Sequence, residues 1–254
     1  MAALLALPRA DATVGAAPNA ALTVKGTAFR VALRDGKTLL SPDLVGVVLE
    51  AMDDAGQPLT IRIDGVRLDA SAPGGDIWLH SLSTRDRVTG EWRELCGPAP
   101  DGTVAGFPLA GRWTSDGRHL QDARAFSITC ASGAIGKCVR FGYRPWAEVG
   151  GRPLWHYHQA CVRLLRADYG GDGTAHTRDG TLIDLYDEIG IQRPDVAARG
   201  LSFEAAWGPN GAVCVRRTRI SDLLTIETLA AKYPRVANGP DCSEMTSALL
   251  WNRS

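Results

Sequence analysis

Hydrophobic and polar residues alternate along much of the first half of the chain, a period that is typical of half-buried β-strands. The alternation is clearest at residues 22–33, which end at the turn pair Asp35-Gly36, and at residues 59–68. Residues 45–52 are apolar enough for another strand. We therefore predict strands over these three segments.

A β-hairpin is predicted next. Residues 76–84 and 91–96 each place large apolar side chains on one face, and Thr89-Gly90 lies in the connection between them. A glycine in a short connection is typical of hairpin turns. Several prolines then interrupt the pattern, before a short predicted strand at residues 111–113.

After Phe126 the hydrophobic period lengthens to that of helices. The spacing predicts helices over residues 132–143 and 153–169. We expect the glycines at 170 and 171 to end the second helix in the left-handed conformation. This helix carries an apolar stripe at three- and four-residue spacing, formed by Leu154, Tyr157, Cys161, Leu164 and Leu165.

The last part of the chain mixes both periods. A strand is predicted at residues 182–186. A hairpin is predicted from residues 203–207 and 212–217, which flank the turn at 209–211. A final helix is predicted at 221–232, with Ser221 as its N-cap. The tail, 233–254, is loop-like, but we expect its apolar end to pack against the rest of the protein.

These elements predict an α+β fold, in which a β-rich N-terminal half packs on a C-terminal half with two or three helices and short hairpins. We expect a leader or disordered N-terminus at 1–21, a β-rich region at 22–125 and an α+β region at 126–254. One continuous domain over 22–254 is the alternative. The apolar start is shorter than the roughly 7–15 apolar residues of a signal peptide core, so a signal peptide remnant and an Ala-rich leader both remain open.

Charge and length exclude several classes of protein. The 254 residues carry 28 basic and 28 acidic side chains, and this balance gives no field that favours nucleic acid. No apolar run approaches the length of a transmembrane segment, about 18 residues. We therefore expect neither a nucleic-acid partner nor a transmembrane segment.

The chain contains six cysteines and none of them forms a CxxC pair, which argues against a zinc ribbon or a thioredoxin-type redox motif. An even, dispersed set favours disulfides and an oxidising compartment, whereas buried free thiols are the alternative. Six cysteines allow 15 pairings. The pairing that we favour is Cys96–Cys130, Cys138–Cys161 and Cys214–Cys242.

Residues 156–187 resemble the signature of the ADYC-domain proteins, a bacterial family of mostly secreted or lipoprotein-like chains. The family is named for Ala-Asp-Tyr-Cys, usually followed by Gly-Asp-Gly. Here the string is Ala167-Asp168-Tyr169-Gly170, followed by residues 171–173, Gly-Asp-Gly. The resemblance extends over residues 22–254, through strings such as 108–113, 142–146, 177–181 and 251–254. It implies a secreted or envelope protein, and it implies no particular activity.

The family cysteine is replaced by Gly170 in this chain. If that cysteine is a nucleophile in relatives, this chain lacks it and is a binding-only member. If it forms a disulfide in relatives, we expect one of the six remaining cysteines to be left without a partner.

His158 and Cys161 are the candidate catalytic residues, because a thiolate beside a histidine is the basis of cysteine hydrolases and transpeptidases. Residues 158–164 are also similar to the Ser-His-Gly-Cys-(Ile/Val)-Arg core of L,D-transpeptidases. They depart from it in the spacing of His and Cys, in the absence of Ser-His-Gly and in their predicted helix. The competing interpretation, which we favour, is a buried disulfide cysteine beside a core histidine.

The loop after this helix carries Asp168, Asp172, His176 and Asp179, with Asp184 and Asp187 beyond it. Carboxylates in a Gly-rich loop can bind Ca²⁺, but this spacing does not match an EF-hand. Asp-Gly pairs are typical of turns, so we expect turns and no metal or cofactor.

Trp and Tyr side chains with Arg line many peptide and glycan sites. The function that we expect is therefore a non-catalytic binding or structural module for an extracellular ligand, a peptide or a glycan. The alternative is a cysteine-dependent hydrolase or transpeptidase. The candidate binding residues are Trp146, Trp155, Tyr157, Arg163, Asp168, Tyr169, Asp172, His176, Arg178 and Asp179.

Overall fold

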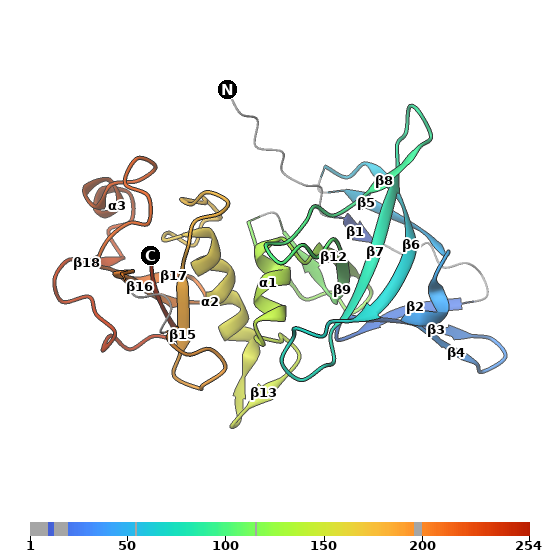
Figure 1. Ribbon diagram of the computed structural model, residues 1–254, viewed down its shortest axis with the longest axis horizontal. Helices are drawn as coiled ribbons and strands as arrows, with labels where there is room; N and C mark the ends of the chain where they lie inside the picture. The colour runs from blue at the N-terminus through green and yellow to red at the C-terminus, as the bar shows by residue number, and fades with distance from the viewer. Residues whose placement is uncertain (1–9, 13–19, 54, 115, 196–199) are drawn as a thin grey trace. The chain divides into compact units, whose positions relative to one another are not determined.

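The computed structural model describes the chain except for residues 1–9, 13–19, 54, 115 and 196–199. The chain divides into two compact units, Met1–Arg140 and Phe141–Ser254, which are described separately (Figure 1). No helix among the described residues is long and apolar enough to cross a membrane. The expected leader at 1–21 falls largely outside the described residues, apart from the short strand β1 and the first two residues of β2.

The first unit is built around an antiparallel sheet that closes on itself. The strands follow the order β6-β5-β1-β12-β9-β7, and β6 pairs with β7 to complete the ring. Strand β8 pairs with the last three residues of β7, Ser83–Arg85. The strands are β1 (Ala10–Ala12), β5 (Val48–Asp53), β6 (Pro58–Leu68), β7 (Trp78–Arg85), β8 (Trp92–Glu94), β9 (Gly106–Ala110) and β12 (Phe126–Cys130).

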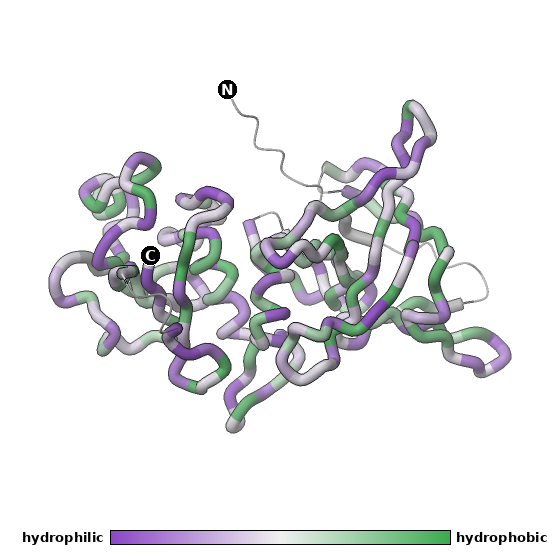
Figure 2. The backbone as a smooth tube through the Cα atoms, viewed as in Figure 1, coloured by the Kyte–Doolittle hydropathy of each residue, from purple (hydrophilic) through white to green (hydrophobic). Residues whose placement is uncertain are grey.

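Alternation explains why this sheet closes around an apolar core. On β6, Ile61 and Ile63 are fully buried, whereas Arg62 between them is half-exposed. The disulfide Cys96–Cys130 joins this core. Figure 2 shows hydrophobic and hydrophilic stretches interspersed along both units, as expected where each strand has one buried face.

Smaller elements complete the first unit. β2 (Ala20–Lys25), β3 (Ala28–Leu33) and β4 (Thr38–Leu40) form a three-stranded sheet. The single strand predicted at 22–33 is therefore wrong: Gly26, with a φ of 61°, turns the chain into a hairpin. The remaining elements are a 3₁₀ turn at Ser41–Leu44, the pair β10 (Arg112–Trp113) and β11 (His119–Leu120), and helix α1 (Ala134–Arg140).

The second unit is a five-stranded sheet with helix α2 packed on it. The strand order is β15-β19-β16-β17-β18, and α2 packs on β16, β17 and β19. A hairpin, β13–β14, precedes α2, and helix α3 follows the sheet strand β17. The bounds are β13 (Glu148–Val149), β14 (Arg152–Pro153), α2 (Leu154–Arg166), β15 (Asp184–Asp187), β16 (Phe203–Gly208), β17 (Gly211–Val215), α3 (Ile226–Lys232), β18 (Ala237–Asn238) and β19 (Leu250–Arg253).

The α+β fold class and its disulfides are confirmed. Cys96–Cys130 and Cys214–Cys242 are bonded as expected. Cys138 and Cys161 are disulfide-bonded too, so no cysteine is free. The glycine at position 170 therefore leaves none of the six cysteines without a disulfide partner.

Two boundaries differ from the sequence prediction. The units divide after Arg140 rather than after residue 125, because β12 pairs with β1 and β9 of the first unit. Helix α3 begins five residues later than predicted, after Thr225, whose hydroxyl accepts a hydrogen bond from the Thr228 amide. Ser221 is therefore not its cap.

Candidate functional site

The motif Ala167-Asp168-Tyr169-Gly170 follows directly from the end of α2. Ala167 adopts the left-handed conformation, with a φ of 49°, and its amide donates to the Leu164 carbonyl. We predicted that Gly170 and Gly171 end this helix in the left-handed conformation. That prediction is wrong, because the left-handed residue at the end of α2 is Ala167. A left-handed non-glycine residue costs about 1 kcal/mol, so the contacts beyond it must stabilise the turn.

Asp168 is the first of those contacts. Its Oδ2 accepts a hydrogen bond from Arg163 at 2.6 Å and from the Gly173 amide at 2.9 Å. The side chains of Arg163 and Asp168 are 3% and 0% exposed. This buried pair closes the Gly-rich loop on the helix that precedes it, and neither charge is available to a ligand.

Tyr169 lies at the centre of a second buried network. Its hydroxyl donates to Glu204 Oε1 at 2.9 Å and accepts from the Arg219 amide at 2.8 Å. Its ring stacks on Trp207 at 5.3 Å between centroids. Burial, together with the Glu204 carboxylate, raises the pKa of the Tyr169 hydroxyl far above its ordinary value, so it remains a hydrogen-bond donor.

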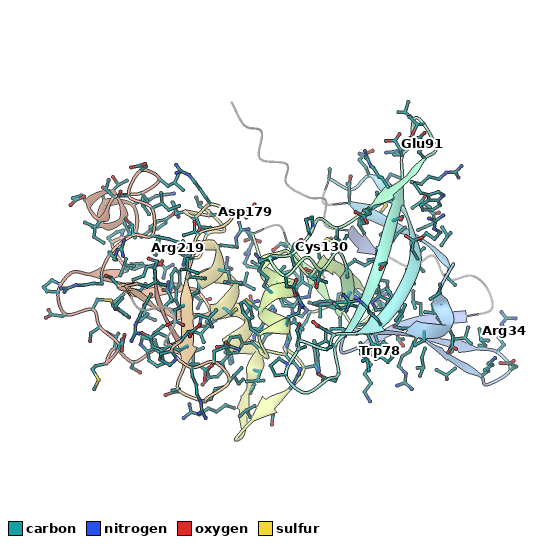
Figure 3. All side chains as sticks on the ribbon, viewed as in Figure 1. Arg34, Trp78, Glu91, Cys130, Asp179 and Arg219 are labelled. Atoms are coloured by element: carbon teal, nitrogen blue, oxygen red, sulfur yellow. A yellow bond between two sulfur atoms is a disulfide. The ribbon has the colours of Figure 1, made fainter. Side chains whose placement is uncertain are left out.

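Arg219 balances the charge of Glu204. Its Nε and one terminal nitrogen donate to the two carboxylate oxygens at 3.0 and 3.1 Å. The remaining donors reach the Leu164 carbonyl, the Leu165 carbonyl and the Thr177 hydroxyl. Arg219, which is labelled in Figure 3, therefore uses all five of its N–H groups, and two of them donate to carbonyls in the last turn of α2.

Asn252 on β19 completes this network. Its amide nitrogen donates to Glu204 Oε2 at 2.7 Å, and its carbonyl oxygen accepts from the Trp207 indole at 2.8 Å. The sequence analysis missed Glu204, Arg219 and Asn252. A charged residue within an apolar strand, such as Glu204 in residues 203–208, is the signal that would have indicated a buried ion pair.

Gly170 lies against the ring of Tyr233. A Cβ added at Gly170 would lie 2.1 Å from Tyr233 Cε1, far inside contact distance. The Tyr233 hydroxyl in turn donates to Asp172 at 3.0 Å. In this chain an aromatic ring thus occupies the space that a cysteine side chain would need.

His158 and Cys161 are both completely buried in α2. Cys161 is disulfide-bonded, and His158 has partners within the protein. A disulfide sulfur is not a thiolate, so Cys161 is not a nucleophile in this structure. This arrangement corresponds to the interpretation that we favoured from the sequence.

The aromatic candidates divide into buried and exposed residues. Tyr157, which stacks on the buried Tyr143 at 6.4 Å between ring centroids, and Tyr169 lie in the core, whereas Trp155 is half-buried and Trp146 is 42% exposed. The structure therefore does not gather the predicted aromatic residues into one open groove.

The loop candidates also separate. His176 is buried and its Nδ1 lies 3.1 Å from the Ala167 carbonyl, whereas Asp172, Arg178 and Asp179 are exposed. Figure 3 labels Asp179 in this loop. Among the described residues, no group of three or more His, Cys, Asp or Glu side chains is arranged to hold a metal ion.

One open cavity of about 470 Å³ lies beside the Tyr169 network, where β17 leads toward α3. Arg216, Arg217 and Arg219 line it, with hydroxyl side chains and Glu227. The sequence analysis missed this cavity. Three arginines within four residues, directly after a strand, are the signal that would have indicated it.

The comparison with protein families agrees with the motif. The family model of the ADYC domain matches residues 41–221, more than half of the chain. The chain therefore belongs to the ADYC-domain family. No curated protein and no solved structure matches it.

Proposed function

We propose that the chain is a secreted or envelope-associated binding module without catalytic activity of its own. The observation that carries the proposal is the use of the most reactive segment of the sequence in internal bonds. Asp168 and Tyr169 are engaged by Arg163 and Glu204, and Cys161 is disulfide-bonded. These groups stabilise a scaffold and present no nucleophile or general base to a substrate.

The cysteines support the compartment. All six are disulfide-bonded, and structural disulfides form and persist in oxidising environments. The extracellular or periplasmic space is such an environment. The alternative function, a cysteine-dependent hydrolase or transpeptidase, would require reduction of the Cys161 disulfide and opening of a fully buried site.

Exposed residues of the second unit support binding. Trp146 is 42% exposed, and Asp172, Arg178 and Asp179 are exposed on the loop after the motif. Exposed tryptophan and charged side chains are suited to peptide or glycan contacts. The scaffold holds them without requiring reactive chemistry.

Co-sedimentation with isolated bacterial cell-wall sacculi, which present both peptide and glycan, tests this proposal. We expect the disulfide-intact protein to pellet with the sacculi while releasing no soluble fragments detectable by mass spectrometry. Trp146→Ala is expected to lower the bound fraction, and Leu182→Ala, at a 69% exposed apolar position, is the control. Absence of binding, or a release of fragments that alkylating reagents block, would overturn the proposal.

A further inference from the structure

The cavity lined by Arg216, Arg217 and Arg219 adjoins the buried hydrogen-bond network around Tyr169. The Arg219 amide donates to the Tyr169 hydroxyl, and its guanidinium is held by Glu204. The amides of Arg216 and Arg217 both donate to the Glu204 carbonyl, at 2.8 and 3.3 Å. The backbone from residue 216 to residue 219 is therefore fixed by the same buried residues that surround the motif tyrosine.

The two arginines at the opening differ from Arg219. Arg219 is 7% exposed and its charge is balanced by Glu204, so it forms a neutral, immobile wall. Arg216 and Arg217 are exposed. Arg217 donates to the Ser254 carbonyl at 2.6 Å, whereas none of the described residues forms a hydrogen bond or ion pair with the Arg216 guanidinium.

The chemistry of this lining is that of an oxyanion site. Guanidinium groups bind carboxylate and phosphate through paired N–H donors, more strongly than neutral donors do. Ser221, exposed in the same lining, adds a hydroxyl donor. Arg216 retains its donors, and Arg217 has donors beyond the one that it gives to Ser254.

Glu227 opposes this charge from the same lining. Hydrogen bonds from the backbone at the start of α3 and from the Thr225 hydroxyl lower the pKa of Glu227, so it is a carboxylate at neutral pH. The exposed side chains of Arg216, Arg217 and Glu227 together therefore carry a net charge of +1. This balance suits a single oxyanion group better than a polyanion.

We propose that this cavity binds an oxyanion group, a carboxylate or a phosphate, through Arg216 and Arg217. The proposal rests on the proposed binding function and names the chemistry of the ligand. The group belongs either to a phosphate ester or to an acidic peptide or sugar. Soluble probes test the cavity independently of the sedimentation with sacculi, so the two proposals fail separately.

The test is isothermal titration of the disulfide-intact protein with two probes, inorganic phosphate and N-acetylglutamate. We expect saturable binding of at least one probe, and a loss of affinity of about tenfold or more in R216A/R217A. E227Q is expected to bind about threefold more tightly, because it removes a repelling charge. R30A/R193A, which removes the same charge at exposed positions outside the cavity lining, is the control and should match the wild type.

The two probes identify the source of the group. Binding of phosphate alone indicates a phosphate ester, and binding of N-acetylglutamate alone indicates a carboxylate ligand. No saturable binding of either probe to the wild type would overturn the proposal. Equal affinity in R216A/R217A and in R30A/R193A would also overturn it, and so would weaker binding by E227Q.

Discussion

The ring of Tyr233 lies in the space that a side chain at residue 170 would occupy, with only 2.1 Å between Tyr233 Cε1 and a Cβ built on Gly170. Tyr233 directly follows α3, more than sixty positions along the chain from the motif. Because Tyr233 is buried and its hydroxyl donates to Asp172, its ring has little freedom to move away. The glycine in this motif is therefore a packing requirement of this chain.

Gly170→Ala is expected to destabilise the protein by about 1–3 kcal/mol, the usual cost of adding a carbon to a filled core. Urea denaturation measures the free energy of unfolding. Gly208→Ala is the control, because its Cβ would lie 3.5 Å from Val213, an ordinary contact. In a Tyr233→Ala background Gly170→Ala should cost less than it does alone. An equal cost in both backgrounds would contradict the role of Tyr233.

Tyr169→Phe tests the buried network. The change removes one donor from Glu204, which keeps its hydrogen bonds from Arg219 and Asn252, and it leaves the Arg219 amide without its partner. We therefore expect a loss of about 1–3 kcal/mol in the free energy of unfolding. Tyr157→Phe is the control, because its hydroxyl contacts the exposed pair Arg152 and Glu188 and should cost only about 0.5 kcal/mol. Similar losses in the two variants would show that the network adds nothing to stability.

The free energy of unfolding is expected to decrease as the pH is lowered, because of His80 in the first unit. Burial lowers the pKa of the His80 imidazole to about 4, and its Nε2 lies 2.9 Å from the Ser41 hydroxyl. Between the unfolded pKa of about 6.5 and the folded pKa, the unfolded chain binds the proton and the folded protein does not. The stabilisation is therefore complete above about pH 6.5 and is lost as the pH falls toward 4, by about 2 kcal/mol between pH 7 and pH 4.5.

The measurement is urea denaturation across this pH range for the wild type and His80→Gln. Acidic groups such as Asp69, whose pKa is lowered by hydrogen bonds from Arg140 and Ser71 in spite of its burial, are present in both proteins. The difference between the two pH profiles therefore isolates the histidine. A difference that does not change with pH would contradict its assignment as a buried neutral group.

Much of the fold could be predicted from the sequence because its pattern is local. The period of two at residues 59–68 corresponds to β6. The apolar stripe of residues 154–165 lies on α2, where all its members except Leu165 are buried, together with polar side chains such as His158 and Arg163. The hairpin around Asn210 was predicted from its turn residues alone. Local pattern could not reveal that β6 pairs with β7 to close a sheet, because that pairing depends on contacts distant in sequence.

The candidate site was harder to predict for the same reason. The motif residue Tyr169 stood out in the sequence, but its partners Glu204 and Arg219 lie 35 and 50 positions further along the chain. Polar residues gathered in one segment resemble a reactive site until those partners are known. In this protein the partners engage these residues in buried hydrogen bonds, and the exposed charged groups nearby are Arg216 and Arg217.

Alkylation without reduction tests the central claim, that the reactive segment serves as a disulfide-stapled scaffold. The unfolded, unreduced protein is treated with iodoacetamide, and its intact mass is measured before and after reduction. We predict no added label before reduction and six labels after it, since no cysteine is free. Labelling of Cys161 without reduction would contradict the account and restore a thiol enzyme as the function to test.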